Sequence, residues 1–366
     1  MKVLNLLATG NVGGIEVLCN NIDISQKFDN YWCFLFGGGK IAEKIKKRNE
    51  DKTFIFEYSK KNFKKRINKI IKICNENKVD IITIHHGGTY CNIIYCELKR
   101  RLKHVKFIRF LHSCYEEQYN LSGNFIENKL NLYFINKALK KSDLIICVSK
   151  AVKETYKKKF HIKEKKIKVI YNGIPDGFLK GTKNVLKNEQ ANYIYIGRLE
   201  KVKGIDLLID AFNKVLEKEP NAKLTIVGDG QERRKLEEQA KNLAIWNKVE
   251  FTGTKDSIKK YLDKADIFIY PSVWKEAFGI SVVEAMARGC IPITFNKGGL
   301  VEIIENQKNG YIVEKIESEE LAKTMLQAIN NSNGEKIIQN AQETAKKFLI
   351  SKTIIKLKEA YHELIE

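Results

Sequence analysis

The chain has 366 residues, of which 43% are hydrophobic and 30% charged, so it is too long for one ordinary core and fits two domains of about 150 residues each. It contains no run of about 18 uncharged apolar residues, which excludes an ordinary transmembrane helix. Nearly all of the net charge of +21 lies in residues 1–170, which hold 35 Lys and Arg against 16 Asp and Glu, whereas residues 171–366 hold 30 against 28. This asymmetry can steer the first half to an anionic lipid surface or nucleic acid, or it can simply keep a lysine-rich surface soluble.

Cysteine usage and the first residues indicate the compartment. The eight cysteines form no CxxC pair and several lie in strand-like apolar runs, so we expect free buried thiols and no metal site. Residues 1–10 contain one lysine and a short apolar run that reaches glycine too early for a signal peptide. We therefore expect a cytoplasmic protein, either soluble or peripheral on the inner face of the membrane.

Short apolar runs alternate with longer amphipathic segments along the first half. The predicted strands are residues 3–7, 31–36, 54–56, 81–84, 107–111, 144–148 and 168–170. Helical segments between them include residues 63–75 and 128–140. Alternation of this kind predicts an α/β domain with a parallel, doubly wound sheet over residues 1–170.

A turn-rich and then polar, aperiodic stretch at residues 171–191 predicts a linker. The pattern then restarts over residues 192–345, with predicted strands at 193–196, 224–227, 249–251, 267–270, 291–294 and 311–313 and helices at 204–218, 231–242, 257–264 and 280–288. The two halves predict two Rossmann-like β/α/β domains in tandem. We expect the amphipathic end of the chain, about residues 346–366, to pack back on the first domain.

Glycines and histidines follow the predicted strands of the first half. Gly13 and Gly14 lie between the first strand and a helix, where glycine backbone can approach a phosphate, although the GxGxxG spacing is absent. His85, His86 and His112 fall at the carboxyl ends of two strands, where ligands bind in such sheets. A lone histidine is more often structural than catalytic, but its position makes His112 a candidate for contact with a ligand.

In the second half, Arg198 and Lys203 leave the carboxyl end of the first strand, within Gly-Arg-Leu-Glu-Lys-Val-Lys-Gly. Two cations at this edge of an open sheet can neutralise the charge that grows on a departing diphosphate. A solvated basic turn is the alternative.

A longer motif runs from Tyr270 to Gly289 and contains two glutamates eight residues apart. Glu276 is expected in a loop before a helix and Glu284 more than one turn inside that helix. The backbone N–H groups around Phe278, Gly279 and Ile280 would then form a helix N-terminus suited to a diphosphate. One carboxylate can reach sugar hydroxyls and the other ribose hydroxyls, unless both simply belong to an ordinary amphipathic helix.

This motif resembles the EX7E signature of the GT4-type (glycosyl transferases group 1) retaining glycosyltransferases with the GT-B fold. The surrounding PS…E-x-FG…EAMA-x-G…GG pattern is also similar, with Ala277 in place of the usual proline. The Arg198 and Lys203 segment resembles the GRL…KG element of the same family, and the Gly13-Gly14 loop resembles its GG-x-E loop. The resemblance covers nearly the whole chain, most densely residues 193–302.

The resemblance implies two Rossmann-like domains facing a central cleft and a nucleotide-sugar donor held on the second domain. It assigns a catalytic role to Glu276, His112, Arg198 and Lys203. It assigns donor contacts to Arg198, Lys203 and Glu276 and also to Gly13, Gly14, Phe278, Gly279, Ile280 and Glu284. His85 and His86 remain acceptor-side candidates. The family requires no cofactor or metal, and a front-face displacement fits the cation-rich, base-poor pattern.

The resemblance leaves the substrates open. A UDP-sugar is our first expectation for the donor and GDP-mannose the second. The acceptor is expected to be a saccharide or a lipid-linked saccharide of capsule, exopolysaccharide or envelope synthesis. A basic segment at residues 60–73, with Phe63, Ile67 and Ile70 on one stripe, would bind anionic lipid or pack on its own core.

Three other functions share part of the pattern. A nucleotide-sugar epimerase would use the same architecture without an acceptor, and a phosphorylase would need a lysine placed for a pyridoxal Schiff base. A nucleic-acid binder would explain the charge, but the basic half shows no helix-turn-helix, zinc-finger or RNP-like pattern, so no nucleic-acid partner is expected.

Overall fold

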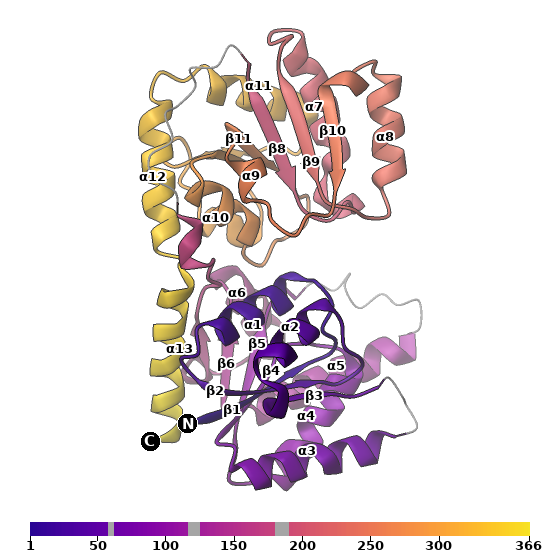
Figure 1. The fold of residues 1–366 in the computed structure, drawn as a ribbon, viewed down its shortest axis with the longest axis vertical. Coiled ribbons are helices and arrows are strands. Elements are labelled where there is room, and N and C mark those ends of the chain that lie inside the picture. Colours follow the sequence, from indigo (N-terminus) through magenta and orange to yellow (C-terminus); the bar gives the residue numbers. More distant parts are fainter. Residues whose placement is uncertain (58–61, 116–124, 180–189) are drawn as a thin grey trace. The chain divides into compact units, whose positions relative to one another are not determined.

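The computed structural model describes residues 1–57, 62–115, 125–179 and 190–366. The chain divides into two compact units, one formed by Met1–Gly173 with Ile350–Glu366 and the other by Ile174–Leu349 (Figure 1). The first boundary thus lies within the first residues of the predicted linker, most of whose remaining residues, 180–189, lie outside the described ranges. The second boundary lies four residues after the predicted end of the second domain.

The first unit contains a seven-stranded parallel sheet in the order β3-β2-β1-β4-β5-β6-β7. Its strands are β1 Lys2–Leu7, β2 Asp29–Phe34, β3 Thr53–Ile55, β4 Ile81–Ile84, β5 Lys106–Leu111, β6 Leu144–Cys147 and β7 Ile167–Val169. Each predicted strand of this half is present, and no end moves by more than two residues. The apolar runs are continuous because helices cover both faces of a parallel sheet.

Seven helices belong to the first unit in the described part of the chain. They are α1 Gly14–Ile24, α2 Lys40–Arg48, α3 Phe63–Asn77, α4 Thr89–Arg101, α5 Phe125–Lys141, α6 Lys150–Phe160 and α13 Ile350–Ile365. Helix α13 buries Ile354 and Leu357 in the same core cluster as Ile108 and Ile146 of the sheet. The last helix of the chain therefore packs on the first unit, beginning at Ile350.

The apolar stripe on α3 faces the core of its own unit. Ile67, Ile70 and Cys74 are buried in one cluster with β1, β2 and β4, and Phe63 and Ile71 pack against that cluster. A helix that packs its apolar stripe on its own core does not lie with that stripe on a bilayer surface. The lipid-binding interpretation of this stripe is therefore wrong.

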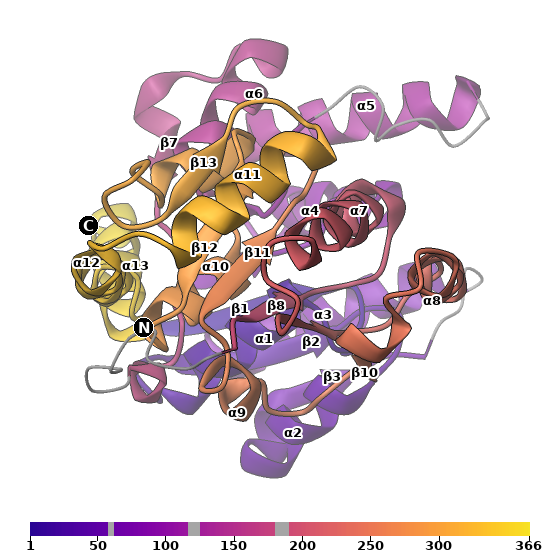
Figure 2. The ribbon, with the colours of Figure 1, turned by 90° about the horizontal axis from the view of Figure 1, so that it is seen from above.

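The second unit contains a six-stranded parallel sheet in the order β10-β9-β8-β11-β12-β13. Its strands are β8 Asn192–Ile196, β9 Lys223–Val227, β10 Val249–Gly253, β11 Ile267–Tyr270, β12 Ile291–Phe295 and β13 Tyr311–Val313. Its helices are α7 Ile205–Leu216, α8 Arg233–Asn242, α9 Lys259–Leu262, α10 Ile280–Ala287, α11 Ser318–Ile329 and α12 Gly334–Lys346. Helix α11 lies over β11, β12 and β13 and packs against α7 (Figure 2).

Both sheets reverse their strand order at one point, between β1 and β4 in the first unit and between β8 and β11 in the second. In open α/β sheets, ligands bind outside the carboxyl ends of the strands at such a switch point. All eight cysteines are free and buried, as the sequence predicts. Within the described ranges, no helix has both the length and the apolarity needed to cross a bilayer.

Candidate active site

The loops that follow β8 and β11 are locked together at the switch point of the second sheet. The Val273 amide donates to the Val202 carbonyl at 3.1 Å. Gly204 has φ +64°, and a Cβ at this position would lie 2.3 Å from the Pro271 carbonyl oxygen. Only glycine allows the two loops to approach so closely. The turn that carries Lys203, η5 (Lys201–Lys203), is thereby fixed beside the loop that carries Glu276.

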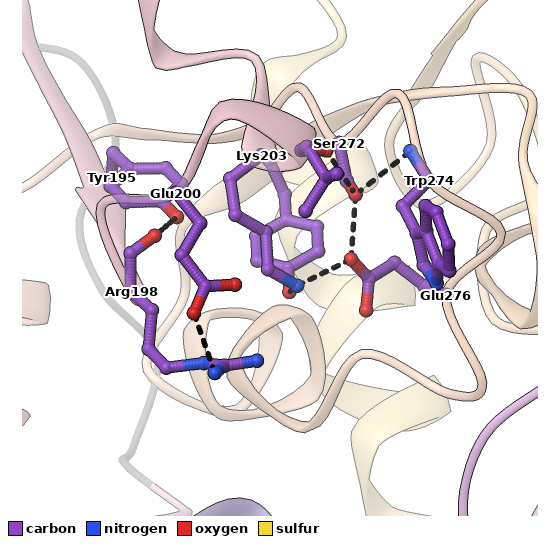
Figure 3. A network of polar contacts seen from close by, with 9 residues as sticks. Tyr195, Arg198, Glu200, Lys203, Ser272, Trp274 and Glu276 are labelled. Atoms are coloured by element: carbon purple, nitrogen blue, oxygen red, sulfur yellow. Dashed lines mark hydrogen bonds and ion pairs between the residues drawn. The ribbon is translucent and has the colours of Figure 1, made fainter. Parts of the chain in front are cut away.

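Lys203 and Glu276 form an ion pair at this point (Figure 3). The Lys203 Nζ lies 2.6 Å from Glu276 Oε1, and each side chain is only 12% exposed. The Ser272 hydroxyl donates to the same oxygen at 2.6 Å, and Nζ also donates to the Tyr270 hydroxyl at 3.2 Å. Such charge-assisted bonds in a largely dry site hold the carboxylate in one orientation. The sequence analysis predicted both charged residues but not their pairing.

Two glycines after β12 support the loop that carries Glu276. The Gly299 amide donates to the Glu276 carbonyl at 2.7 Å. Gly298 has φ +59°, and a Cβ there would lie 2.3 Å from that same carbonyl oxygen. The Gly-Gly pair therefore acts as a platform for the Glu276 backbone, because any side chain would push the loop away.

Helix α10 begins directly after this loop. Gly279 precedes it with φ +94°, and a Cβ there would meet Leu300 at 2.5 Å. Phe278 is buried and packs edge-on against Phe348 with ring centroids 5.3 Å apart. The helix starts at Ile280, so the amides of its first turn point out of the helix end, as a diphosphate site requires.

Glu284 lies inside α10, in surroundings unlike those of Glu276. The residue is half-buried. Desolvation by the surrounding protein raises the pKa of its carboxyl to about 8. A carboxyl with this pKa is largely protonated at neutral pH and can donate one hydrogen bond as well as accept others. This property suits a group that binds hydroxyls, which both donate and accept.

Arg198 forms an ion pair separate from that of Lys203 and Glu276. Its side chain is 72% exposed, and its Nη1 lies 2.6 Å from Glu200 Oε1 (Figure 3). Its carbonyl accepts a hydrogen bond from the Tyr195 hydroxyl at 2.9 Å, which fixes the backbone and leaves the guanidinium on the outside. An exposed ion pair of this kind is weak, so the guanidinium can exchange Glu200 for an anionic ligand at little cost.

In the first unit, the Gly13–Gly14 loop is tied to the loop after β4. Gly13 caps α1, and a Cβ there would lie 2.5 Å from Glu16 Oε2. The Glu16 carboxylate in turn lies 3.3 Å from His86 Nε2, while His86 Nδ1 accepts from the Ala8 amide at 3.2 Å. The two predicted glycines thus lie at the switch point of the first sheet together with His86.

His112 follows β5, and its ring stacks on that of His85, which follows β4. His85 Nδ1 and His112 Nε2 are 3.0 Å apart, and both rings stack with Phe110. His85 is 3% exposed, and both of its ring nitrogens are occupied, Nδ1 by His112 and Nε2 by Thr83, so it has no polar atom left for an acceptor and that expectation is wrong. Its burial reflects its position one residue beyond β4, where its ring is covered by the neighbouring strand β5.

The hydrogen bonds behind His85 determine which ring nitrogens carry protons. The Asn5 amide nitrogen faces the carbonyl of Tyr31, so Asn5 Oδ1 faces Thr83, whose hydroxyl donates to it at 2.8 Å. Thr83 therefore accepts from His85 Nε2 at 3.2 Å, which leaves His85 Nδ1 as an acceptor for His112 Nε2. His112 consequently presents Nδ1 as a bare acceptor, and no partner for it occurs in the part of the chain described.

Burial also keeps both rings neutral. Desolvation, together with electrostatic repulsion from His86 and Arg109, lowers the pKa of His112 to about 3. The same causes, and the neighbouring His112, hold the pKa of His85 well below its usual range. A neutral His112 with an unprotonated Nδ1 can accept a hydrogen bond from a ligand hydroxyl. We found no group of three or more His, Cys, Asp and Glu side chains in the described ranges that could hold a metal ion.

Two doubly wound parallel sheets, one in each unit, match the GT-B fold of glycosyltransferase structures such as HepE. Residues 32–178 match the family described as glycosyltransferase family 4, and residues 180–347 match glycosyl transferases group 1. The two matches together extend over most of both units. The chain belongs to this GT4-type family of glycosyltransferases.

Known relatives agree with this assignment. An uncharacterized glycosyltransferase of Methanocaldococcus jannaschii is 33% identical over 257 residues, which are 66% of this chain and 64% of that protein, a little under two thirds of its length. N-acetyl-alpha-D-glucosaminyl L-malate synthase of Bacillus anthracis is 27% identical over 286 residues, covering 76% of this chain and 72% of the relative. HepE of Anabaena in complex with UDP has a TM-score of 0.84 at 22% identity, covering 99% of this chain and 100% of HepE.

Sequence reasoning missed four contributors to the site. Ser272 and Tyr270 hold the Lys203–Glu276 pair, and the only signal for them was their place at the end of a strand beside the motif. Thr83 and Asn5 determine the tautomer of His112 from inside the first sheet. Polar residues in otherwise apolar strands were the signal that could have revealed this second pair.

Proposed function

We propose that the protein is a retaining glycosyltransferase that moves a sugar from a UDP-sugar to a saccharide or lipid-linked saccharide. The observation that carries this proposal is the largely buried Lys203–Glu276 pair, whose glutamate lies on the loop that leads into the N-terminal turn of α10. Cationic and amide donors at the carboxyl edge of a sheet suit a nucleoside diphosphate. A fixed carboxylate next to them suits the hydroxyls of the transferred sugar.

Each donor-side group takes one role in this proposal. The α10 amides around Ile280 and the Lys203 ammonium bind the diphosphate, and Arg198 leaves Glu200 to join them. Glu284 binds the ribose hydroxyls and Glu276 orients the sugar. His112 of the first unit accepts a hydrogen bond from a sugar hydroxyl through Nδ1. The bare Nδ1 and the neutral ring support this last role.

The proposed reaction is a front-face displacement. The bond between the anomeric carbon and the donor phosphate oxygen breaks, and the acceptor oxygen bonds to the same face of that carbon. The acceptor hydroxyl proton passes to the departing phosphate oxygen, so no protein base is needed. Lys203, Arg198 and the helix amides stabilise the growing negative charge, which in this proposal replaces a metal or other cofactor.

UDP is the favoured nucleotide because solved structures with this fold include HepE with UDP and with UDP-glucose. None of the relatives and structures named above favours GDP-mannose, and those relatives are transferases or synthases rather than epimerases. The acceptor and pathway are proposed only as a class, a glycan or lipid-linked glycan of the cell envelope or capsule.

Calorimetric titration with UDP, GDP, ADP and their sugars tests the donor side. We expect wild-type protein to bind UDP and UDP-sugars most tightly, and Glu284→Ala to weaken UDP binding at least ten-fold. Glu238→Ala on α8, whose exposed carboxylate pairs with Arg234, is the matched control and should bind as wild type does. Absence of binding of every nucleotide to wild-type protein would contradict the proposed function.

A further inference from the structure

Arg109 is a buried cation with no counter-ion among the residues that the structure describes. It lies on β5, is 3% exposed, and its Nη1 has no hydrogen-bond partner among the residues described. Burial lowers the pKa of its guanidinium, but arginine remains protonated in proteins. Charged side chains are almost never fully buried unless they are paired, because desolvation is expensive.

The groups around Arg109 do not neutralise it. Those that interact with its charge are Tyr95, Cys91 and Cys96 of α4 and Tyr156 of α6, and no carboxylate is among them. Burial raises the pKa of Cys91 to about 11 and that of Tyr156 to about 12, so both are uncharged at neutral pH. The positive charge also reaches the imidazole of His112, whose pKa it lowers.

The guanidinium approaches the ligand edge of the first sheet at Gly87. A Cβ on Gly87 would lie 3.4 Å from Arg109 Nη2, so the missing side chain brings the guanidinium close to the loop backbone after β4. Gly88 follows and caps α4 without a side-chain hydrogen bond, and α4 begins at Thr89. The positive end of a thirteen-residue helix and a buried cation therefore meet at one place.

An apolar cavity of about 270 Å³ adjoins the same loop. Gly87, Gly88 and Thr89 form one side of it, and Phe36 and Phe63 line it from other elements. A second buried guanidinium, that of Arg66, stacks on Phe36 at 5.1 Å from the ring centroid and also lines the cavity. The surroundings thus suit a molecule that carries an anion beside an apolar group.

We propose that Arg109 and the N-terminal turn of α4 bind the phosphate of a phosphorylated acceptor, whose adjoining apolar group enters the cavity lined by Phe36 and Phe63. This inference rests on the proposed function, because it presupposes a glycosyl acceptor, which it places on the first unit. A phosphate fits both a planar guanidinium and helix amides. The phosphate of a lipid-linked saccharide and the phosphate of a small phosphorylated sugar share this chemistry, and the apolar cavity favours the lipid-linked form.

In the ligand-free protein, the buried charge of Arg109 lowers the stability of the fold. Replacing a buried, unpaired charge by an apolar side chain of similar length removes a desolvation penalty. Arg109→Met is therefore expected to raise the melting temperature of the ligand-free protein while it removes the phosphate site. A purely structural arginine would behave in the opposite way, because its loss would lower the melting temperature.

The test is calorimetric titration of the full chain with butyl phosphate, inorganic phosphate and butanol, with UDP titrated in parallel. We expect butyl phosphate to bind wild-type protein at least ten-fold more tightly than inorganic phosphate, and butanol not to bind. Arg109→Met should weaken butyl phosphate binding at least ten-fold and leave UDP binding within two-fold. Arg101→Met, at an exposed arginine of α4 that pairs with Glu97, is the matched control and should change neither.

A second variant guards against a folding defect in the first. Gly87→Ala keeps Arg109 but places a methyl group 3.4 Å from Nη2, and should weaken butyl phosphate binding at least three-fold. Butyl phosphate binding that is unchanged in both variants, or absent from wild-type protein, overturns the site. Equal affinity for butyl and inorganic phosphate overturns the apolar subsite. Failure of UDP to bind, with intact butyl phosphate binding, contradicts the proposed function alone.

Discussion

The Lys203 ammonium lies 2.6 Å from the Glu276 carboxylate, and the Ser272 hydroxyl and the Tyr270 ring enclose the pair. Because both charges are nearly buried, the geometry of each depends on the other. A ligand phosphate that approaches Lys203 would share the ammonium with Glu276 rather than find it free. In the proposed function, the pair would therefore couple the diphosphate end of a donor to its sugar end.

Breaking this pair should cost stability as well as activity. We expect Lys203→Met to lower the free energy of unfolding by about 3 kcal/mol, because it removes the ammonium charge that compensates the largely buried Glu276 carboxylate. The double variant Lys203→Met with Glu276→Leu should recover most of that loss but no transferase activity. Urea denaturation of the two variants, with glycosyl transfer measured alongside, checks both expectations.

Arg198→Met is the control for this experiment, because Arg198 is exposed and its ion pair in the described part of the chain is with Glu200 at the surface. Its free energy of unfolding should stay within about 0.5 kcal/mol of wild type, while UDP-sugar binding weakens. A Lys203→Met protein as stable as wild type would show that the pair does not hold the two loops.

Glu284 should make stability depend on pH. Burial raises its pKa to about 8 in the folded protein, so the folded state favours the protonated carboxyl more than the unfolded chain does. The stabilisation is complete below the unfolded pKa of about 4.3 and is lost as pH rises towards 8. Glu284→Gln lacks this loss, so its stability relative to wild type should increase from pH 5 to pH 8.5 and then level off.

Urea unfolding at pH 5.5, 7 and 8.5 measures this difference. Glu238→Gln removes an exposed carboxylate from α8 and should differ from wild type by no more than about 0.5 kcal/mol at each pH. A Glu284→Gln protein whose stability difference from wild type does not change with pH would show that Glu284 is well solvated.

The sequence was sufficient to predict the architecture because both sheets are parallel and buried on both faces. Their strands appear as apolar runs bounded by turn residues, and the motifs fall where those runs end. Lys203 and Glu276 could be assigned to one site, since they follow two strands that flank a switch point. Their direct pairing could not be predicted, because it depends on the close approach of Gly204 to Pro271. No periodicity of the sequence encodes this approach.

Two wrong expectations have physical causes of the same kind. The apolar stripe of α3 looks identical in sequence whether it faces lipid or its own core, and packing against β1, β2 and β4 decides the question. His85 and His112 both follow strands, but His85 is covered by β5 and only His112 remains partly accessible. The accessible ring could not be identified without the relative register of β4 and β5.

The tautomer of His112 should depend on Thr83. In wild-type protein we expect the proton on Nε2, because Thr83 directs His85 to accept from His112. Thr83→Val removes the acceptor for His85 Nε2, so the His85 proton should move to Nδ1 and that of His112 to its own Nδ1. Side-chain 15N NMR of histidine-labelled protein detects this change directly.

Thr83→Ser is the matched control, since it keeps the hydroxyl and should keep the Nε2–H tautomer. If His112 contacts a donor hydroxyl, Thr83→Val should lower kcat about ten-fold and Thr83→Ser should not. An Nδ1–H tautomer of His112 in wild-type protein would falsify the derived chain of hydrogen bonds.

Gly298→Ala should damage the site through the backbone of Glu276. Gly298 has φ +59°, and its new Cβ would lie 2.3 Å from the Glu276 carbonyl oxygen, so the loop must move and the carboxylate with it.

Gly253→Ala is a close control, because Gly253 has φ +70° but its Cβ would meet only the end of the Arg233 side chain, at 3.3 Å. Both variants carry the left-handed strain of about 1–2 kcal/mol, whereas only Gly298→Ala forces two backbone segments apart. We therefore expect both variants to lower the urea midpoint, Gly298→Ala by more than Gly253→Ala, and a loss of transferase activity of at least a hundred-fold in Gly298→Ala alone. Comparable activity in the two variants would show that the Gly298–Gly299 platform does not determine the position of Glu276.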